Sequence, residues 1–259
     1  MAGKSTRVVD AEWIYGMHAV LAVLKTEPQR VTELRLLRER RDQRLKKIES
    51  LAQQHGIARV PVGREQLDAL VSGNHQGVAA LCTAGEVRDE GYLARLLDNL
   101  DRPPLLLVLD GVTDPHNLGA CLRTADAAGV DAVLAPKDKS AGMNATVRKV
   151  ASGAAESVPF VVVTNLARTL AQLRDRGIWL VGAAGDAADT LYDVDLSGSL
   201  GLVLGAEGKG MRRLTRENCD LLVKLPMAGT VSSLNVSVAA GVCLYEACRQ
   251  RRLGSASNG

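Results

Sequence analysis

Two short segments of this chain combine glycine with polar side chains in a pattern suited to chemistry on a small molecule. The apolar run Leu202 to Leu204 leads into Gly205-Ala-Glu-Gly-Lys-Gly210, where Glu207 is a candidate general base or hydrogen-bond acceptor. Glycine lets the backbone approach a ligand closely or adopt a positive φ. Further along, Ser233 and Asn235 lie where a helix begins, and a helix N-terminus offers N–H groups without intrahelical partners. Together these segments predict a site made largely of backbone.

The glycine spacing argues against two familiar nucleotide-binding loops. Glycines at positions 205, 208 and 210 match neither the G-x-x-x-x-G-K-[ST] loop of nucleoside triphosphatases nor the G-x-G-x-x-G fingerprint of dinucleotide-binding proteins. A dinucleotide-dependent oxidoreductase is therefore an alternative suggested only by the glycine loops and by α/β alternation. Measuring NAD(H) binding would decide it.

A second pair of polar side chains stands in an otherwise small and apolar helix. Asp114 and Pro115 mark the helix start, Asn117 follows at once, and Arg123 lies six residues further, within two turns of the start. The preceding residues 105–109 form an unbroken apolar run, typical of a strand buried on both faces. Because ligands of α/β sheets bind beyond the carboxyl ends of strands, we expect Asn117 and Arg123 to belong to the site. A helix cap and a surface charge are the alternative interpretation.

Alternating strands and helices in the second part of the chain would position these side chains. The predicted strands are residues 105–109, 132–135, 160–163, 179–183, 202–204 and 221–225. The predicted helices are residues 117–128, 145–151, 166–176 and 236–248. This order predicts an α/β fold with a parallel sheet covered by helices on both faces.

The first part of the chain predicts a smaller α/β domain over residues 12–85. Its predicted elements are a helix over 13–24, a strand over 31–37, a helix from Arg38 to near Gly56, a strand over 58–62, a helix over 64–71 and a strand over 77–82. We expect a disordered lead over residues 1–11, a polar linker over 86–103 with one short helix-like piece over 91–100, the second domain over 104–253 and a tail over 254–259.

The positive charge of the chain is concentrated in the first domain. Residues 1–85 contain 13 Lys and Arg against 9 Asp and Glu, whereas the remaining residues contain 19 against 20. The basic cluster consists of Arg38, Arg40, Arg41, Arg44 and Lys47. One interpretation is an RNA-binding surface, whose basic side chains displace counterions from RNA phosphates. A solvated helix face is the other, because nearby acidic residues dilute the cluster.

The amino-acid composition limits which classes of protein the chain can belong to. The 259 residues are 46% hydrophobic with a mean hydropathy of +0.02, and no apolar run is long enough to cross a membrane, so we expect a cytoplasmic protein without a membrane partner. Aromatic residues make up only 3%, so RNA contacts would depend on charge and backbone shape rather than on stacking. Five cysteines without a C-x-x-C pair and four scattered histidines indicate neither disulfides nor a metal site.

Three ordered motifs resemble those of the SpoU family of RNA ribose 2′-O-methyltransferases, part of the SPOUT superfamily. They are Asn117 to Arg123, Leu204-Gly-Ala-Glu-Gly-Lys-Gly210 and Leu225-Pro-Met-Ala-Gly-Thr-Val-Ser-Ser-Leu-Asn-Val-Ser-Val238. Residues 12–85 resemble the small substrate-binding domain of the family, so the resemblance covers the whole chain. The resemblance is strongest to the branch that methylates a guanosine of 23S rRNA. The chain differs from that branch in its lead of about ten residues and its short tail.

The resemblance implies a fold and a cofactor. A SPOUT domain with a deep trefoil knot replaces the ordinary doubly wound sheet that the rarity of knots would favour. S-adenosylmethionine would bind in a bent form, held by main-chain groups of Gly205, Leu225 and Leu234 and bordered by Ala183, Met227 and Ala228. The family also implies a homodimer that packs the helix over 236–248 and the helix over 117–128 against a two-fold mate.

The resemblance implies roles for the catalytic candidates as well. Arg123 would activate the ribose hydroxyl or stabilise its developing charge, and the second role fits a guanidinium better because it stays protonated and is a poor base. Asn117, Glu207, Ser233 and Asn235 would position ribose, RNA and Arg123. Two alternatives stay open: a tRNA ribose 2′-O-methyltransferase, which shares the motifs, and a non-catalytic RNA-binding factor of ribosome assembly.

Overall fold

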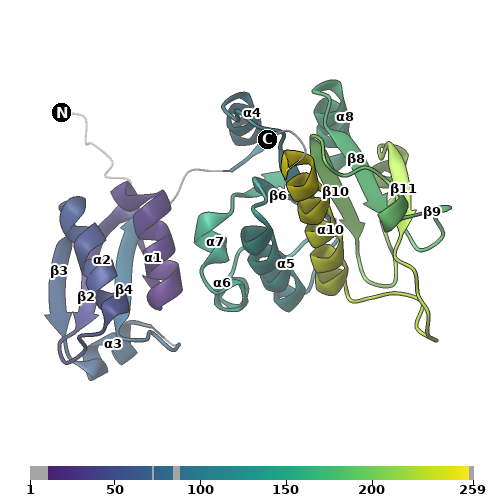
Figure 1. The fold of residues 1–259 in the computed structure, drawn as a ribbon. Coiled ribbons are helices and arrows are strands. Elements are labelled where there is room, and N and C mark those ends of the chain that lie inside the picture. The colour runs from purple at the N-terminus through teal and green to yellow at the C-terminus, as the bar shows by residue number, and fades with distance from the viewer. Residues whose placement is uncertain (1–10, 72, 84–87, 257–259) are drawn as a thin grey trace, which may run out of the picture. The chain divides into compact units, whose positions relative to one another are not determined.

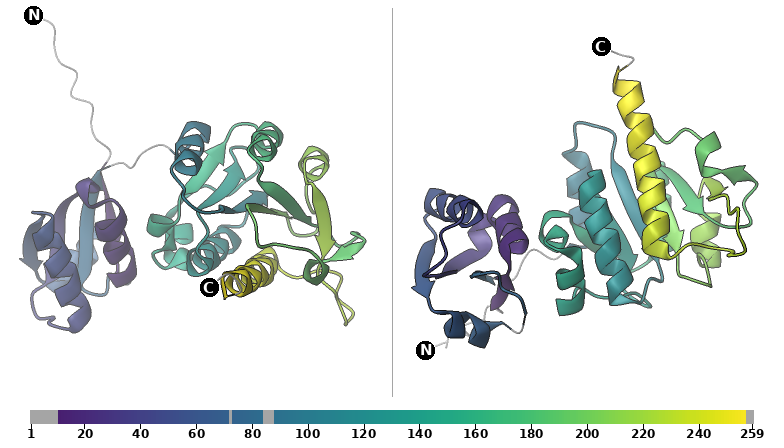
Figure 2. Two further views of the ribbon diagram at one scale, coloured as in Figure 1. Left: turned by 45° about the horizontal axis from the view of Figure 1, so that its top comes forward. Right: turned by 60° about the horizontal axis from the view of Figure 1, so that its bottom comes forward.

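The computed structural model describes residues 11–71, 73–83 and 88–256 (Figure 1, Figure 2). The chain divides into two compact units, Met1–Glu86 and Val87–Gly259, and each is considered by itself. The predicted lead lies outside the described residues except for Ala11, which begins a strand.

The N-terminal unit is a four-stranded sheet with helices on both faces. Its elements are β1 (Ala11–Tyr15), α1 (Met17–Thr26), the 3₁₀ helix η1 (Pro28–Arg30), β2 (Val31–Leu37), α2 (Gln43–Gln54), β3 (Ala58–Val62), α3 (Arg64–Leu70) and β4 (Val78–Thr83). The strand order is β1-β4-β2-β3, with β2 and β3 parallel and β4 antiparallel to both of its neighbours. The main core of this unit joins the sheet to α1 and α2.

Two predictions for this unit are corrected by the structure. Residues 13–15 belong to strand β1, which pairs with β4, because Gly16 with φ of 91° separates the strand from helix α1. Helix α2 begins at Gln43 rather than at Arg38. The Asp42 side chain accepts hydrogen bonds from the backbone N–H groups of Arg44 and Leu45, both at 3.0 Å, and so caps the helix there.

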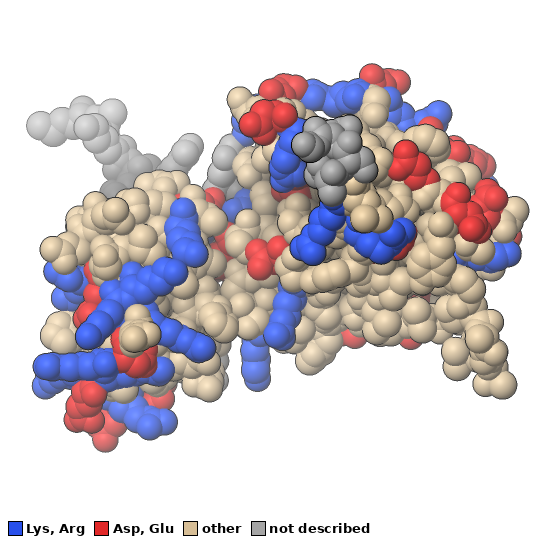
Figure 3. Space-filling model, in the orientation of Figure 1, with Lys and Arg blue, Asp and Glu red and all other residues tan. Residues whose placement is uncertain are grey.

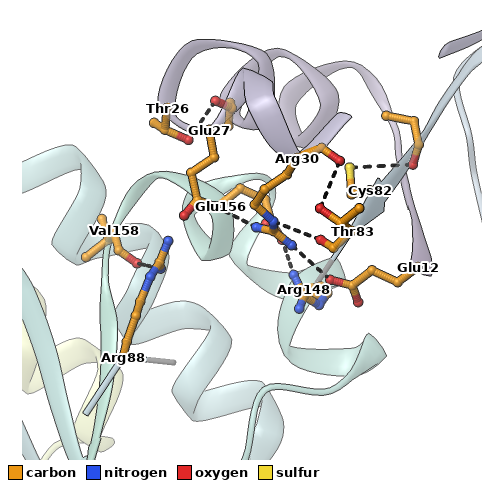
Figure 4. Close-up of polar contacts among 12 residues, drawn as sticks. Glu12, Thr26, Glu27, Arg30, Cys82, Thr83, Arg88, Arg148, Glu156 and Val158 are labelled. Carbon is orange, nitrogen blue, oxygen red and sulfur yellow. Dashed lines mark hydrogen bonds and ion pairs between the residues drawn. The ribbon is translucent and has the colours of Figure 1, made fainter. Parts of the chain in front are cut away.

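A largely buried arginine connects three elements of the N-terminal unit (Figure 4). Nε of Arg30 donates a hydrogen bond to the carbonyl oxygen of Thr83 at 3.0 Å, so η1 is joined to the end of β4. Its guanidinium also forms ion pairs with Glu27 at 2.5 Å and with Glu12 of β1 at 3.4 Å. Because a buried charge is costly unless it is paired, this network fixes how β1, the end of β4 and the connection to β2 fit together.

The C-terminal unit is built on a seven-stranded, fully parallel sheet. Its strands are β5 (Leu105–Asp110), β6 (Ala132–Pro136), β7 (Phe160–Val163), β8 (Trp179–Ala183), β9 (Asp189–Thr190), β10 (Leu200–Gly205) and β11 (Leu221–Lys224). They lie in the order β7-β6-β5-β10-β8-β11-β9. The helices are α4 (Glu90–Asp98), α5 (Pro115–Ala128), α6 (Ala145–Ala151), α7 (Ala154–Ser157), α8 (Leu166–Asp175), the 3₁₀ helix η2 (Leu191–Asp193), α9 (Arg213–Glu217) and α10 (Val236–Ala256).

Helices cover both faces of this sheet, as predicted. Helices α5 and α10 lie side by side over one face, together with α6 and α7, and their apolar residues form the largest core cluster of the protein (Figure 2). Helices α4 and α8 cover the other face with a second cluster. The sheet is therefore buried on both sides, which explains the unbroken apolar runs of its central strands.

The predicted linker contains part of the C-terminal unit. Helix α4 buries Leu93, of which 3% is exposed, in the core cluster that also contains the apolar residues of α8. In addition, the N–H of Val162 in β7 donates to the Arg88 carbonyl at 3.0 Å. The predicted helical piece over 91–100 is thus helix α4, but the polar composition of residues 86–103 favoured a linker, because only one face of this helix is apolar. The unit therefore starts by residue 88 rather than at 104.

The far end of the chain also differs from the prediction. Helix α10 continues to Ala256, so the predicted tail is helical over 254–256, and residues 257–259 lie outside the described residues. Within the described part of the chain, no helix is long and apolar enough to cross a membrane. No group of three or more His, Cys, Asp or Glu among those residues is arranged to hold a metal ion.

Candidate active site

A cavity of about 410 Å³ opens at the carboxyl ends of β8, β10 and β11. Its walls are the loops that follow these strands, with contributions from α9 and α10. The lining residues are Ala183, Ala184, Gly185 and Asp186 after β8, the segment 204–211 at the end of β10, Arg216 of α9, Leu225, Met227, Ser232, Ser233 and Leu234 after β11, and Val236 and Ala239 of α10. The cavity lies at the sheet edge where the sequence predicted a site, and most of its lining residues lie in loops.

The loop after β10 folds back on itself to form one wall. Ala206 and Gly210 exchange two backbone hydrogen bonds, at 3.1 and 2.8 Å. A Cβ built on Gly205 would lie 2.0 Å from the carbonyl carbon of Gly210, so no larger residue fits there. Gly208 and Gly210 have φ values of 75° and 64°. Gly205 is thus required by the approach of its own loop, and the two following glycines are required by the turn.

A buried ion pair ties this loop to the next strand of the sheet. Asp110, the last residue of β5, accepts hydrogen bonds from Nε of Arg212 at 2.6 Å and from the Arg212 backbone N–H at 2.8 Å. The side chain of Asp110 is 0% exposed, whereas that of Arg212 is 46% exposed. This pair was not predicted from the sequence. The only signal was a carboxylate at the end of an apolar strand, 102 residues away from its partner.

A second ion pair crosses the rim of the cavity. The guanidinium of Arg216 in α9 forms two parallel hydrogen bonds, at 2.9 and 3.0 Å, with the carboxylate of Asp186 in the loop after β8. Hydrogen bonding to Arg216 holds the pKa of Asp186 below its ordinary value. The pair therefore stays ionised at neutral pH and joins two walls of the cavity. Sequence analysis did not single out either residue.

The first and third sequence motifs meet beside the cavity. Nδ2 of Asn235, directly before α10, donates a hydrogen bond to Oδ1 of Asn117 in the first turn of α5, at 3.0 Å. Oδ1 of Asn235 accepts hydrogen bonds from the backbone N–H and the hydroxyl of Ser237, at 2.9 and 2.7 Å. Asn235 thus caps α10 and fixes the start of this helix to α5.

The cavity includes most of the predicted cofactor-binding residues. Five of them line it, namely Ala183, Gly205, Leu225, Met227 and Leu234, whereas Ala228 is exposed and does not. Among the catalytic candidates, Glu207 and Ser233 line the cavity. Asn117, Asn235 and Arg123 lie outside its lining. The Arg123 side chain is exposed, and no hydrogen bond or ion pair joins it to another described residue.

The predicted RNA-contacting residues fall into two groups. The Arg40 guanidinium is bound within its own unit, by the Asp42 carboxylate and by the Gln76 carbonyl oxygen. The other four, Arg38, Arg41, Arg44 and Lys47, are exposed on the β2–α2 loop and on α2. Lys and Arg side chains gather over this region of the N-terminal unit (Figure 3).

Fold and cavity together define a two-unit α/β protein in which a parallel sheet carries a loop-lined cavity of the size that binds a small molecule or cofactor. The model of the SpoU rRNA Methylase family matches residues 104–245. A second model, described as RNA 2'-O ribose methyltransferase substrate binding, matches residues 13–87. The chain belongs to the SpoU rRNA methylase family.

Proteins of similar sequence or structure align with this chain over both of its units. The 23S rRNA (guanosine-2'-O-)-methyltransferase RlmB of Pseudomonas putida is 60% identical over 245 residues, which cover 93% of this chain and 98% of the relative. The enzyme of that name from Escherichia coli (strain K12) is 55% identical over 242 residues, covering 93% and 99%. The crystal structure of the SpoU methyltransferase AviRb from Streptomyces viridochromogenes in complex with AdoMet is similar with a TM-score of 0.75 at 25% identity, covering 94% and 91%.

Proposed function

We propose that this protein transfers a methyl group from S-adenosylmethionine to the ribose 2′-hydroxyl of a guanosine in 23S rRNA. The observation that carries the proposal is the 60% identity to a 23S rRNA guanosine-2′-O-methyltransferase across both units of the chain. The cavity adds independent support, because residues of the second and third motifs form its walls. Action on rRNA would place the protein in the cytoplasm.

The cavity at the ends of β8, β10 and β11 is the proposed cofactor site. Main-chain groups of Gly205, Leu225 and Leu234 would hold S-adenosylmethionine, and Ala183 and Met227 would border it. Ala228, which was expected beside them, is not part of this lining and would act only through the position of its loop. The AdoMet complex of a structural relative supports the choice of cofactor.

The knot of the SPOUT fold is part of the same proposal. Strand β11 lies between β8 and β9, although β8 and β9 precede it in the chain. The segment after β11 meets the loop after β8 at the cavity, where the Ser232 carbonyl oxygen lies 4.0 Å from a Cβ built on Gly185. We propose that residues 225–235 thread through the loop 184–199, which would give the deep trefoil knot.

The proposed chemistry needs the 2′-oxygen held in line with the methyl group and its negative charge stabilised as its proton leaves. S-adenosylmethionine supplies the electrophilic methyl group. Arg123 is suited to clamp the developing anion or an adjacent phosphate, since a guanidinium is a strong multiple donor but a poor base. Asn117 and Asn235, bonded to each other, would position ribose near Arg123, while Glu207 and Ser233 would position groups at the cavity itself.

Substitution of Arg123 tests this assignment. Arg123→Ala should leave the dissociation constant for S-adenosylmethionine within about twofold of wild type, because the side chain is outside the cavity, and should lower methyl transfer to 23S rRNA by about 100-fold or more. Arg123→Lys should restore little methyl transfer, because a lysine ammonium lacks the planar set of N–H donors that a guanidinium presents. Arg176→Ala is the matched control, since it removes an exposed ion pair at the far end of α8. Wild-type turnover in Arg123→Ala would refute the assignment.

The N-terminal unit is the proposed RNA reader. Its exposed Arg38, Arg41, Arg44 and Lys47 would contact phosphates, whereas Arg40 is engaged within its own unit. Parallel assays with 23S rRNA and tRNA transcripts test the substrate class. Methylation of tRNA in preference to 23S rRNA would support the tRNA alternative instead, and cofactor binding without transfer to either RNA would support a non-catalytic assembly factor.

A homodimer is the last part of the proposal. Val238 and Tyr245, separated by two turns of α10, are 51% and 54% exposed, so this helix presents apolar surface beyond its own core. Ala240 and Cys243 are 0% and 1% exposed in that core and would be poor positions for an interface variant. Sedimentation should give roughly twice 27.5 kDa, and Val238→Asp should shift the protein to a monomer. A fully active wild-type monomer would overturn the dimer.

A further inference from the structure

A second cavity, of about 420 Å³, opens at the same edge of the parallel sheet. It lies beyond the ends of β6 and β7, next to the start of α8 and along α9. Its lining residues are Pro136, Asp138, Thr164, Asn165, Leu166, Ala167, Arg212, Arg213, Leu214 and Thr215. Among the described residues, none of these also lines the proposed cofactor cavity.

The segment around α9 forms a wall shared by the two cavities. Met211 and Arg216 line the cofactor cavity, whereas the residues between them, 212–215, line the second one. This wall is held at one end by the buried Asp110–Arg212 pair. Because a helix with its side chains is about 10–12 Å across, a chain molecule that reaches into one cavity can pass over α9 into the other.

The second cavity combines apolar surface with a cationic rim. Leu214 is 51% exposed at its wall, and Pro136 and Leu166 add further apolar lining. The side chains of Arg212 and Arg213 are 46% and 77% exposed, so both guanidinium groups reach solvent even though they pair with Asp110 and Glu217. Asp138 is the acidic residue among those that line this cavity. Apolar surface beside guanidinium groups matches a nucleobase joined to a phosphate.

We propose that this second cavity is a subsite for a nucleotide of the RNA substrate one or two positions away from the methylated ribose. The base packs against Leu214 and its apolar neighbours, and Arg213 contacts the phosphate. The inference rests on the proposed function, because the shared wall orients the occupant only if the RNA reaches the cofactor cavity. It assigns to the C-terminal unit an RNA contact separate from the basic cluster on α2.

Two exposed substitutions test the subsite without touching the cofactor cavity. Arg213→Glu and Leu214→Asp should each weaken binding of a 23S rRNA fragment about tenfold in filter binding and raise KM by a similar factor, with kcat nearly unchanged. The dissociation constant for S-adenosylmethionine should stay within about twofold of wild type. This measurement shows whether the variant is correctly folded. The matched control Arg176→Glu introduces the same charge change directly after α8 and should weaken RNA binding less than threefold.

The outcomes separate this inference from the proposed function. Unchanged RNA binding and KM in both variants, with active wild-type enzyme, would overturn the subsite alone. If the wild type methylates no RNA, the proposed function fails, and the binding comparison still decides whether the cavity contacts RNA. A photoreactive amino acid at position 214 should cross-link within about two nucleotides of the methylated guanosine; cross-links elsewhere only would overturn the placement.

Discussion

Replacing Gly205 by alanine would show whether the cofactor cavity depends on the closed form of its glycine loop. A Cβ on Gly205 would lie 2.0 Å from the carbonyl carbon of Gly210 and 2.1 Å from the backbone nitrogen of Met211. Both neighbours are backbone atoms, so neither can rotate away. The loop after β10, which forms one wall of the cavity, has to move to accept the methyl group.

The size of the effect follows from what the movement disrupts. The two backbone hydrogen bonds between Ala206 and Gly210 each contribute about 0.5–1.5 kcal/mol net. Because the loop has to move, the cost of its closed form is about 1–3 kcal/mol. This penalty weakens binding of S-adenosylmethionine by about 5- to 140-fold, since each 1.4 kcal/mol is a factor of ten.

Isothermal titration of S-adenosylmethionine into the variant measures this loss. Gly142→Ala is the control, because a Cβ at Gly142 has no neighbour within 4 Å and its backbone φ is not positive. It should bind the cofactor within twofold of wild type. Gly208→Ala should fall between the two, since no atom obstructs its Cβ but its φ of 75° costs about 1–2 kcal/mol. Binding within threefold of wild type by Gly205→Ala would refute the reasoning.

Three further predictions concern stability and RNA binding. Arg212→Ala removes the half-exposed cation that pairs with the buried Asp110 carboxylate and should lower the free energy of unfolding in urea by about 1–3 kcal/mol. Burial raises the pKa of Cys121 and Cys243 to about 12, so folded thiols keep protons that unfolded thiols lose above about pH 8.5. The unfolding free energy should therefore fall as pH rises above 9, by up to about 1.4 kcal/mol per pH unit for each thiol, and the double alanine variant should show a flatter profile. A fragment of residues 88–259 should bind S-adenosylmethionine like the full chain but lose most affinity for 23S rRNA in filter binding, and an undiminished affinity would contradict an RNA-reading N-terminal unit.

The strands and helices of the C-terminal unit were largely predictable because its sheet is buried on both faces. The strands over 160–163 and 179–183 and the helix over 145–151 have the predicted bounds, since unbroken apolar runs and clear capping residues identify them. The order of strands was not predictable. Strand β10 lies between β5 and β8, and β11 lies between β8 and β9, because pairing is decided by contacts between residues far apart in the chain.

Local pattern failed where a single residue or an amphipathic face decides the structure. Residues 13–24 have apolar spacing compatible with a helix, but Gly16 divides them into a strand and a shorter helix. Helix α4 has polar residues on its outer face, which made residues 86–103 resemble a linker. Among site residues, the motifs located the cavity walls but not the ion pairs Asp110–Arg212 and Asp186–Arg216 that hold them, because neither pair lies within one local segment.

The position of α9 depends on these ion pairs more than on a core of its own. The helix has five residues, of which only Thr215 is buried, and a helix this short is not stable in isolation. Arg212 fixes its start to β5, and Arg216 fixes its end to the loop after β8. Arg216 and its partner Asp186 line the cofactor cavity, whereas Arg212 and residues 213–215 line the second cavity. A ligand that moves α9 from the side of one cavity changes the other cavity as well. Thermodynamic linkage makes this effect reciprocal. An RNA nucleotide that favours one position of α9 would change the cofactor affinity by the same factor by which the cofactor changes the RNA affinity.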